Sequence, residues 1–184
     1  MGYFDKEESK QAEMVYKSGS EELLKELADI CLEQLMLNSD AYICSIEINM
    51  QGYKRLHRYL SKKFHDLYLK IQKEAVEKYG RAIPSDIEFS VYKPKNMKNH
   101  LNQWNSKIEE HLKHVGLIIK GIFEADGYIC CTAQEIQKCL FKHYIKNERA
   151  IHKFEDCDWS YEVIYEHDEK LHRKMKDKEH DSYK

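Results

Sequence analysis

The chain has 184 residues, of which 34% are charged and 42% hydrophobic, and it contains only two prolines and seven glycines. This composition favours a single domain of long helices over a β-fold with many turns. The formal net charge of −2, with both signs interspersed, argues against a nucleic-acid partner. No apolar run approaches the roughly 20 residues of a membrane span, and the polar start MGYFDKEESK is unlike a signal peptide. We therefore expect a cytoplasmic protein that binds neither membranes nor nucleic acid.

Two helices are predicted in the first part of the chain. Ser20 followed by two glutamates is typical of a helix start, and apolar residues then recur at helical spacing, which predicts a helix over 20–48. A second apolar pattern predicts a helix over 53–79. Gly80 follows it directly, at the position where many helices end with a glycine.

Two more helices are predicted after an irregular connection. Residues 80–98 hold both prolines, and the alternation of apolar and polar residues around 87–91 predicts a short extended stretch. Apolar spacing then predicts a helix over 99–125. Thr132, with a glutamate three residues later, matches a capping box and predicts a fourth helix over 132–160.

The lengths of the connections predict how these helices are arranged. Short connections make the first and second helices, and the third and fourth, antiparallel neighbours. A helix of about 27 residues is about 40 Å long, whereas an extended segment of about 19 residues reaches about 60 Å. The connection at 80–98 can therefore run the length of a bundle, which predicts an all-α, up-down-down-up four-helix bundle with one long crossover. The alternative is an up-down-up-down bundle with a long irregular loop.

These expectations divide the chain into an N-terminal extension (1–19), a helical bundle (20–160) and a charged C-terminal tail (161–184). The tail ends in HDEKLHRKMKDKEHDSYK, in which nearly every residue is charged or polar. Such a segment has little apolar surface to bury, so we expect it to fray even if it continues as helix.

Two stretches resemble the ferritin family. The first, GYKRLHRYLSKKFHDLYLKIQKEAVEKYGR at 52–81, is similar to the second helix of ferritin subunits, with a Gly-aromatic pair at its start and Gly-Arg near its end. The second, FKHYIKNERAI at 141–151, is similar to the fourth-helix segment, and it places Tyr144 and Glu148 at the family's Tyr and Gln or Glu near the iron centre. The resemblance covers about a quarter of the chain and implies a ferritin-like bundle.

The departures from the ferritin pattern bear on activity. Catalytic ferritin chains carry adjacent glutamates and then a His on the second helix, where this chain has Lys63, Phe64 and Leu67. Light-type ferritin chains also lack these ligands. The resemblance therefore implies a light-chain-like subunit without ferroxidase activity of its own. Its partners would be other ferritin-type subunits in a homo- or hetero-oligomeric shell, and iron would be a stored mineral rather than a cofactor bound in the bundle.

The helical faces address the metal site independently of the resemblance. On the second helix, Phe64, Leu67 and Ile71 share the apolar stripe, and the lysines around them lie off it. On the fourth helix, His143 lies within the apolar arc and Glu148 lies at its edge. One inward His without partnering carboxylates is more typical of a hydrogen-bonded core residue than of a di-iron site.

Three functions stay open at this point. The first is a non-catalytic ferritin-type shell subunit, and the second is a ferritin-derived helical interaction or structural protein with no iron role. The third is a ferroxidase with displaced ligands, for which His143, Tyr144 and Glu148 are the weak candidates for metal ligands. The six cysteines form no CxxC pair, and we interpret most of them as small buried apolar residues.

Overall fold

The computed structural model describes the backbone of residues 4–85, 87, 95–122 and 126–181. This described part contains five α-helices and no strand, which confirms that the fold is all-α. The helices are α1 (Phe4–Glu47), α2 (Gln51–Tyr79), α3 (Met97–Ile122), α4 (Gly127–Glu155) and α5 (Tyr161–Asp181). Within the same ranges, no helix combines the length and the apolar content that crossing a membrane requires.

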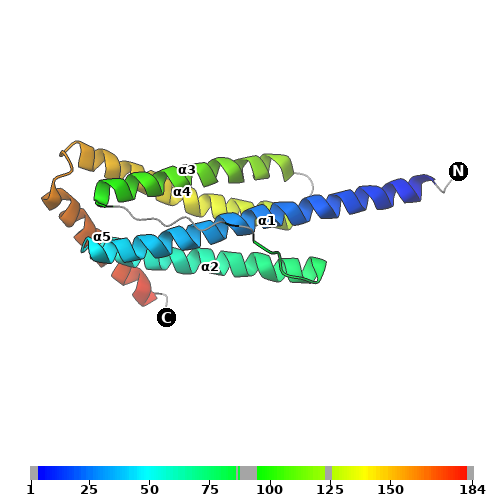
Figure 1. Cartoon of the computed structure of the whole chain (residues 1–184), viewed down its shortest axis with the longest axis horizontal. Coiled ribbons are helices and arrows are strands. Elements are labelled where there is room, and N and C mark those ends of the chain that lie inside the picture. Colours follow the sequence, from blue (N-terminus) through cyan, green and yellow to red (C-terminus); the bar gives the residue numbers. More distant parts are fainter. Residues whose placement is uncertain (1–3, 86, 88–94, 123–125, 182–184) are drawn as a thin grey trace.

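Helices α1 to α4 lie side by side, and α5 lies across one end of them (Figure 1). The closest packing joins α1 to α2 and α3 to α4. In Figure 1, α1 and α4 run toward the end where α5 lies, whereas α2 and α3 run away from it. The end of α2 and the start of α3 therefore lie at opposite ends of the molecule. The first part of α1 extends beyond the other helices.

Helix α2 forms as its sequence pattern predicts. The apolar stripe faces the core, with Phe64, Leu67 and Ile71 only 2%, 4% and 0% exposed. Gly80 ends the helix with a left-handed φ of 73°, and its backbone N–H donates to the carbonyl of Val76 at 2.9 Å. Glycine adopts this φ without steric cost, so the predicted end of the helix is confirmed.

The predicted helix start at Ser20 is wrong, because α1 begins at Phe4 and continues through that residue. The segment before Ser20 is rich in Glu, Lys, Gln, Ala and Met, all of which are good helix formers. Their combined preference outweighs one cap-like serine, and Ser20 is buried within the helix instead of ending it.

The predicted start of the fourth helix at Thr132 is also wrong. Helix α4 begins at Gly127, and the preceding Asp126 caps it. The Asp126 Oδ1 atom accepts hydrogen bonds from the backbone N–H groups of Tyr128 and Ile129, at 3.0 and 3.2 Å. A carboxylate at this position satisfies two donors that the first helical turn leaves free. Thr132 is buried inside the helix.

Other boundaries differ from the prediction by a few residues. Helix α3 begins slightly early, at Met97, and α4 ends at Glu155 rather than at 160. The early end follows from Asp158 and Trp159, whose φ angles of 49° and 54° are incompatible with a right-handed helix. The predicted extended stretch at 87–91 lies outside the described residues apart from its first residue.

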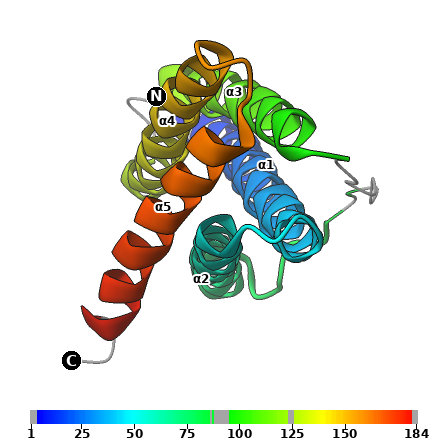
Figure 2. The ribbon, with the colours of Figure 1, turned by 90° about the vertical axis from the view of Figure 1, so that its left-hand side faces the viewer.

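Helix α5 corrects the expectation that the C-terminal tail has little to bury. Ile164 and Met175 are 6% and 2% exposed, because one face of α5 packs against α2. Figure 2 shows α5 crossing that end of the molecule. The two backbones approach so closely at Gly52 that a Cβ atom there would lie 2.2 Å from the carbonyl oxygen of Asp168. Glycine is therefore required at this contact.

A carboxylate also joins α5 to the start of α2. The Asp168 side chain is 3% exposed and accepts hydrogen bonds from the backbone N–H of Gly52 at 3.0 Å and of Tyr53 at 2.9 Å. Burial raises the pKa of this carboxyl group, and the two backbone N–H groups act in the opposite direction. Asp168 therefore caps the start of α2 from a distant part of the sequence. Asp126 caps the start of α4 in the same way, but from the residue directly before the helix.

Candidate functional site

Buried polar side chains from α1 and α3 meet inside the bundle. The amide Nε2 of Gln34 lies 2.8 Å from Nδ1 of His111, and Nε2 of the same imidazole lies 2.8 Å from the carboxylate of Glu33. Because an amide nitrogen only donates, Nδ1 of His111 accepts and its Nε2–H donates to Glu33. This hydrogen bond is the main cause that lowers the pKa of Glu33. His111 is 3% exposed, whereas Glu33 reaches solvent.

The network continues through Asn38 to two further histidines. The Asn38 Nδ2 atom donates to the backbone carbonyl of Gln34 at 2.7 Å, which leaves its Oδ1 to accept from Nδ1 of His57 at 2.9 Å. The Nε2 atom of His57 must then accept, and Nε2–H of His100 donates to it at 2.9 Å. All three of these side chains are 0% exposed. These hydrogen bonds form one connected network across α1, α2 and α3. Its six members, in order of contact, are Glu33, His111, Gln34, Asn38, His57 and His100.

Both inner histidines are neutral near pH 7. Burial lowers the pKa of His100 to about 4. It also holds the pKa of His57 well below its ordinary value, with smaller contributions from His100 and His143. Aromatic rings surround the pair: the His57 ring centroid lies 4.4 Å from that of Trp104, and Tyr53 stacks on the other side at 6.3 Å. In this buried aromatic setting an added proton would be poorly solvated, so the network favours uncharged rings.

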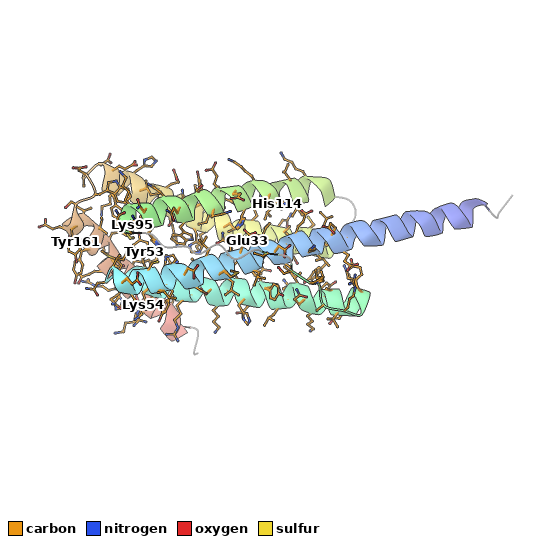
Figure 3. The ribbon with its side chains drawn as sticks, viewed as in Figure 1. Glu33, Tyr53, Lys54, Lys95, His114 and Tyr161 are labelled. Atoms are coloured by element: carbon orange, nitrogen blue, oxygen red, sulfur yellow. The ribbon has the colours of Figure 1, made fainter. Side chains whose placement is uncertain are left out.

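The network runs lengthwise through the interior. Figure 3 shows Glu33 midway along the molecule and Tyr53 near the end that α5 covers. The His114 side chain, also labelled there, makes a separate contact with Glu26 at 2.9 Å near the surface. The polar core thus joins a solvent-facing carboxylate to a sealed aromatic cluster.

The three candidate ligands from the sequence do not converge on one point. His143 is 7% exposed on α4, and burial is the main cause that lowers its pKa to about 3. Glu148 faces α3 instead, where Nδ2 of Asn105 donates to its Oε1. Tyr144 is half-buried, and burial followed by the Glu148 charge raises the pKa of its phenol.

The described part of the chain contains no group of three or more His, Cys, Asp or Glu side chains arranged to hold a metal ion. His57 and His100 are close, but their facing nitrogens share a proton in a hydrogen bond and have no lone pair left for a cation. At the positions where the ferritin resemblance suggests ligands, Phe64 and Leu67 are packed in the core. The arrangement is suited to joining helices through neutral hydrogen bonds.

Two core residues were missed in the sequence analysis. Gln34 and His100 are 1% and 0% exposed, yet neither was assigned to an inner face. Their spacing contained a signal, because Gln34 lies one turn before Asn38, and His100 lies one turn before the fully buried Trp104. Of the six cysteines, Cys31, Cys44 and Cys139 are buried, and the other three are partly or fully exposed.

Comparison with known proteins does not identify a family for this chain. No family model matches the chain, and no curated protein matches it significantly. The resemblance to ferritins at 52–81 and 141–151 therefore stays an expectation from the sequence.

Proposed function

We propose that this protein is a non-catalytic, light-chain-like subunit of a ferritin-type shell, in which iron is a stored mineral and catalytic chains supply the oxidation. The observation that carries the proposal is the course of the four long helices. Helices α2 and α3 run in the same direction although they are consecutive, so a long connection must return along the molecule (Figure 1). One such crossover is characteristic of ferritin-like four-helix bundles and absent from simple up-down-up-down bundles.

The chemistry of the core supports a subunit that does not oxidise iron itself. A di-iron centre in such a bundle draws carboxylates and His side chains inward from facing helices. Here the inward positions of α2 hold Phe64 and Leu67, and the buried polar side chains Asn38, His57 and His100 bond to one another as an amide and two neutral imidazoles. Burying unpaired carboxylates would cost several kcal/mol each, so a core of this kind favours stability over metal binding.

Large apolar side chains on the outer surface support assembly with other subunits. Among the side chains that the structure describes, eight such residues are exposed, and they come from all five helices. They are Ile43, Ile46, Leu69, Val76, Leu117, Phe141, Tyr161 and Tyr165. In the proposed assembly, these side chains are available for contacts between subunits.

Iron handling provides the functional test. We expect the isolated full chain to oxidise ferrous iron no faster than buffer, and shells that contain it together with a catalytic ferritin chain to accumulate a ferric core. The double variant His143→Ala/Glu148→Gln should behave like the wild type in both assays. Oxidation above background by the isolated chain, lost in this variant, would instead establish a ferroxidase with displaced ligands.

The second candidate is a helical interaction protein without an iron role. The observation that favours it is α5, a 21-residue helix that is docked on α2 and whose outer face is highly charged. Metal analysis separates the two functions, because an interaction protein would give native assemblies with no iron above the level of a matched control protein.

A further inference from the structure

A hollow of about 120 Å³ lies where the last turns of α1 meet the first turns of α2. It is partly enclosed and partly open to solvent. Within the described part of the chain, the residues that line it are Tyr42 from α1 and Gln51, Lys54, Arg55 and Arg58 from α2. This hollow, here called the basic cleft, lies near the end of the molecule that α5 covers, where Figure 3 labels Lys54.

The four lining residues of α2 share one side of their helix. Counted from Gln51, they occupy positions i, i+3, i+4 and i+7, which is the spacing of a single helical face. This face points away from the buried stripe that includes Tyr53 and Leu60, which are 2% and 1% exposed. The cations can therefore line the basic cleft without being buried in the core.

A cation–π contact joins the two walls of the basic cleft. Lys54 Nζ lies 5.9 Å from the centre of the Tyr42 ring, so the ammonium group of α2 is held against α1. Lys54 and Arg55 are half-buried, whereas Arg58 is exposed. Arg55 has a further partner within the molecule, but its guanidinium carries five N–H donors and one partner does not use all of them.

Positive charge dominates the lining of the basic cleft. Three of its five described residues are cations and none of the five is an acid. A hollow lined by one sign of charge concentrates the electrostatic potential inside it. Backbone N–H groups at the start of α2 add little, because Asp168 already accepts from those of Gly52 and Tyr53. An anion in the basic cleft must therefore be bound by the side chains.

We propose that the basic cleft binds a phosphate dianion, either free or as the end group of a small phosphomonoester. Guanidinium groups bind phosphate through two parallel hydrogen bonds. A phosphate group carries a charge of about −1.5 to −2 near pH 7, so it balances several cations better than a carboxylate does. The inference does not depend on the proposed shell.

The size and the neutral donors of the basic cleft fit the same ligand. One water molecule needs about 10–15 Å³ of such a volume, so the cleft has room for roughly eight groups of that size. This space accommodates a phosphate group and the first atoms of its ester. The phenol of Tyr42 can donate a hydrogen bond. The amide nitrogen of Gln51 lies 3.4 Å from Oδ1 of Asn49, and its second N–H remains for a ligand.

Calorimetric titration of the full chain with glycerol 3-phosphate at low ionic strength tests the proposal. The variant Lys54→Gln/Arg58→Gln removes two charges from the basic cleft. The control Lys73→Gln/Lys120→Gln removes two exposed charges from the C-terminal parts of α2 and α3, which run away from the end that α5 covers (Figure 1). We expect binding by the wild type, a loss of about tenfold or more in the first variant and a change under about twofold in the control.

A single change separates the shape of the arginine from its charge. Arg58→Lys keeps the positive charge but loses the planar fork, so it should bind more weakly than the wild type and more tightly than the double variant. Because Arg58 is exposed, this variant is expected to fold like the wild type, which thermal unfolding of each protein verifies.

Titrations with inorganic phosphate and with acetate identify the ligand class. Equal affinity for inorganic phosphate and glycerol 3-phosphate indicates the free anion, whereas tighter binding of the ester indicates a phosphomonoester. Acetate should bind at least about tenfold more weakly than either, because it carries a single charge. Acetate binding as tight as that of phosphate, no binding of either phosphate compound, or equal losses in the cleft variant and the control would overturn the proposal.

Discussion

At the scale of single residues, the interior depends on histidines that remain uncharged. His57 and His100 are fully buried and hydrogen-bonded to each other, and Asn38 fixes which nitrogen of His57 carries the proton. A second proton on His57 would place two donors opposite each other within the same hydrogen bond, and a second proton on His100, at Nδ1, would put a charge on a fully buried ring. The polar core is therefore stable only while both rings are neutral.

This arrangement predicts that the protein loses stability as the pH falls below the ordinary pKa of histidine. The folded pKa of His100, about 4, lies below its ordinary value of 6.5, so the unfolded chain binds the proton more strongly. Stability is then fully present above about pH 6.5 and falls as the pH drops toward 4. His100 alone contributes a loss of about 2 kcal/mol by pH 5. The pKa of Glu33 is lowered from 4.5, so the contribution of this group is lost only below that range.

Urea unfolding at several pH values between 7 and 5 measures this effect. The slope of stability against pH should decrease in His100→Gln. It should be unchanged in His65→Gln, because that imidazole is exposed on α2. A wild-type stability that is flat over this range would show that the buried rings are not neutral as described.

At the scale of the elements, the docking of α5 depends on one glycine. The change Gly52→Ala would drive a Cβ atom into the backbone of α5, and we expect it to lower the free energy of unfolding by about 3 kcal/mol. Gly116→Ala is the matched control, because its Cβ would meet nothing closer than Gln137 Nε2 at 3.9 Å. It should stabilise α3 by about 0.5–1 kcal/mol. Equal effects of the two changes in chemical unfolding would contradict the close approach of α5.

The start of α4 gives a second prediction at this scale. Asp126→Ala removes the cap and the ion pair with Lys78, so we expect a loss of about 1 kcal/mol in stability. Asp66→Ala removes an exposed acid whose described contact is with His65 at 3.8 Å, and it should change stability by less than about 0.5 kcal/mol. Thermal unfolding of both variants decides whether Asp126 is the cap.

The elements also show how far the sequence predicts the fold. The α2 pattern was sufficient because its apolar stripe is regular and a glycine ends it. Ser20 and Thr132 were wrongly predicted to begin helices. Residue types that often cap helices also occur inside them, and the local sequence does not distinguish the two positions. The burial of α5 was missed for a different reason: Gly52 and Asp168 are far apart in the sequence, and their contact exists only in the folded chain.

The candidate site was predictable to a similar extent. Burial of His143 and the inward position of Phe64 follow from helical spacing, and the structure agrees with both. The hydrogen bond between His57 and His100 joins α2 to α3. Periodicity places each residue on a face of its own helix but does not indicate which residue on another helix it meets.

At the scale of the whole molecule, the role that we propose is assembly with other subunits rather than catalysis. The interior is occupied by apolar side chains and a hydrogen-bonded polar network, and the outer surface carries exposed apolar residues on every helix. In the proposed mixed shells, catalytic chains would supply the iron oxidation. The oligomeric state is therefore the property that this account most depends on.

Native mass spectrometry of the full chain, purified alone and after coexpression with a catalytic ferritin-type chain, tests this central claim most directly. We predict a closed multi-subunit assembly in at least one of the two preparations, with this chain present in defined numbers. A stable monomer in both preparations, with no entry into the shells of the catalytic chain, would contradict it.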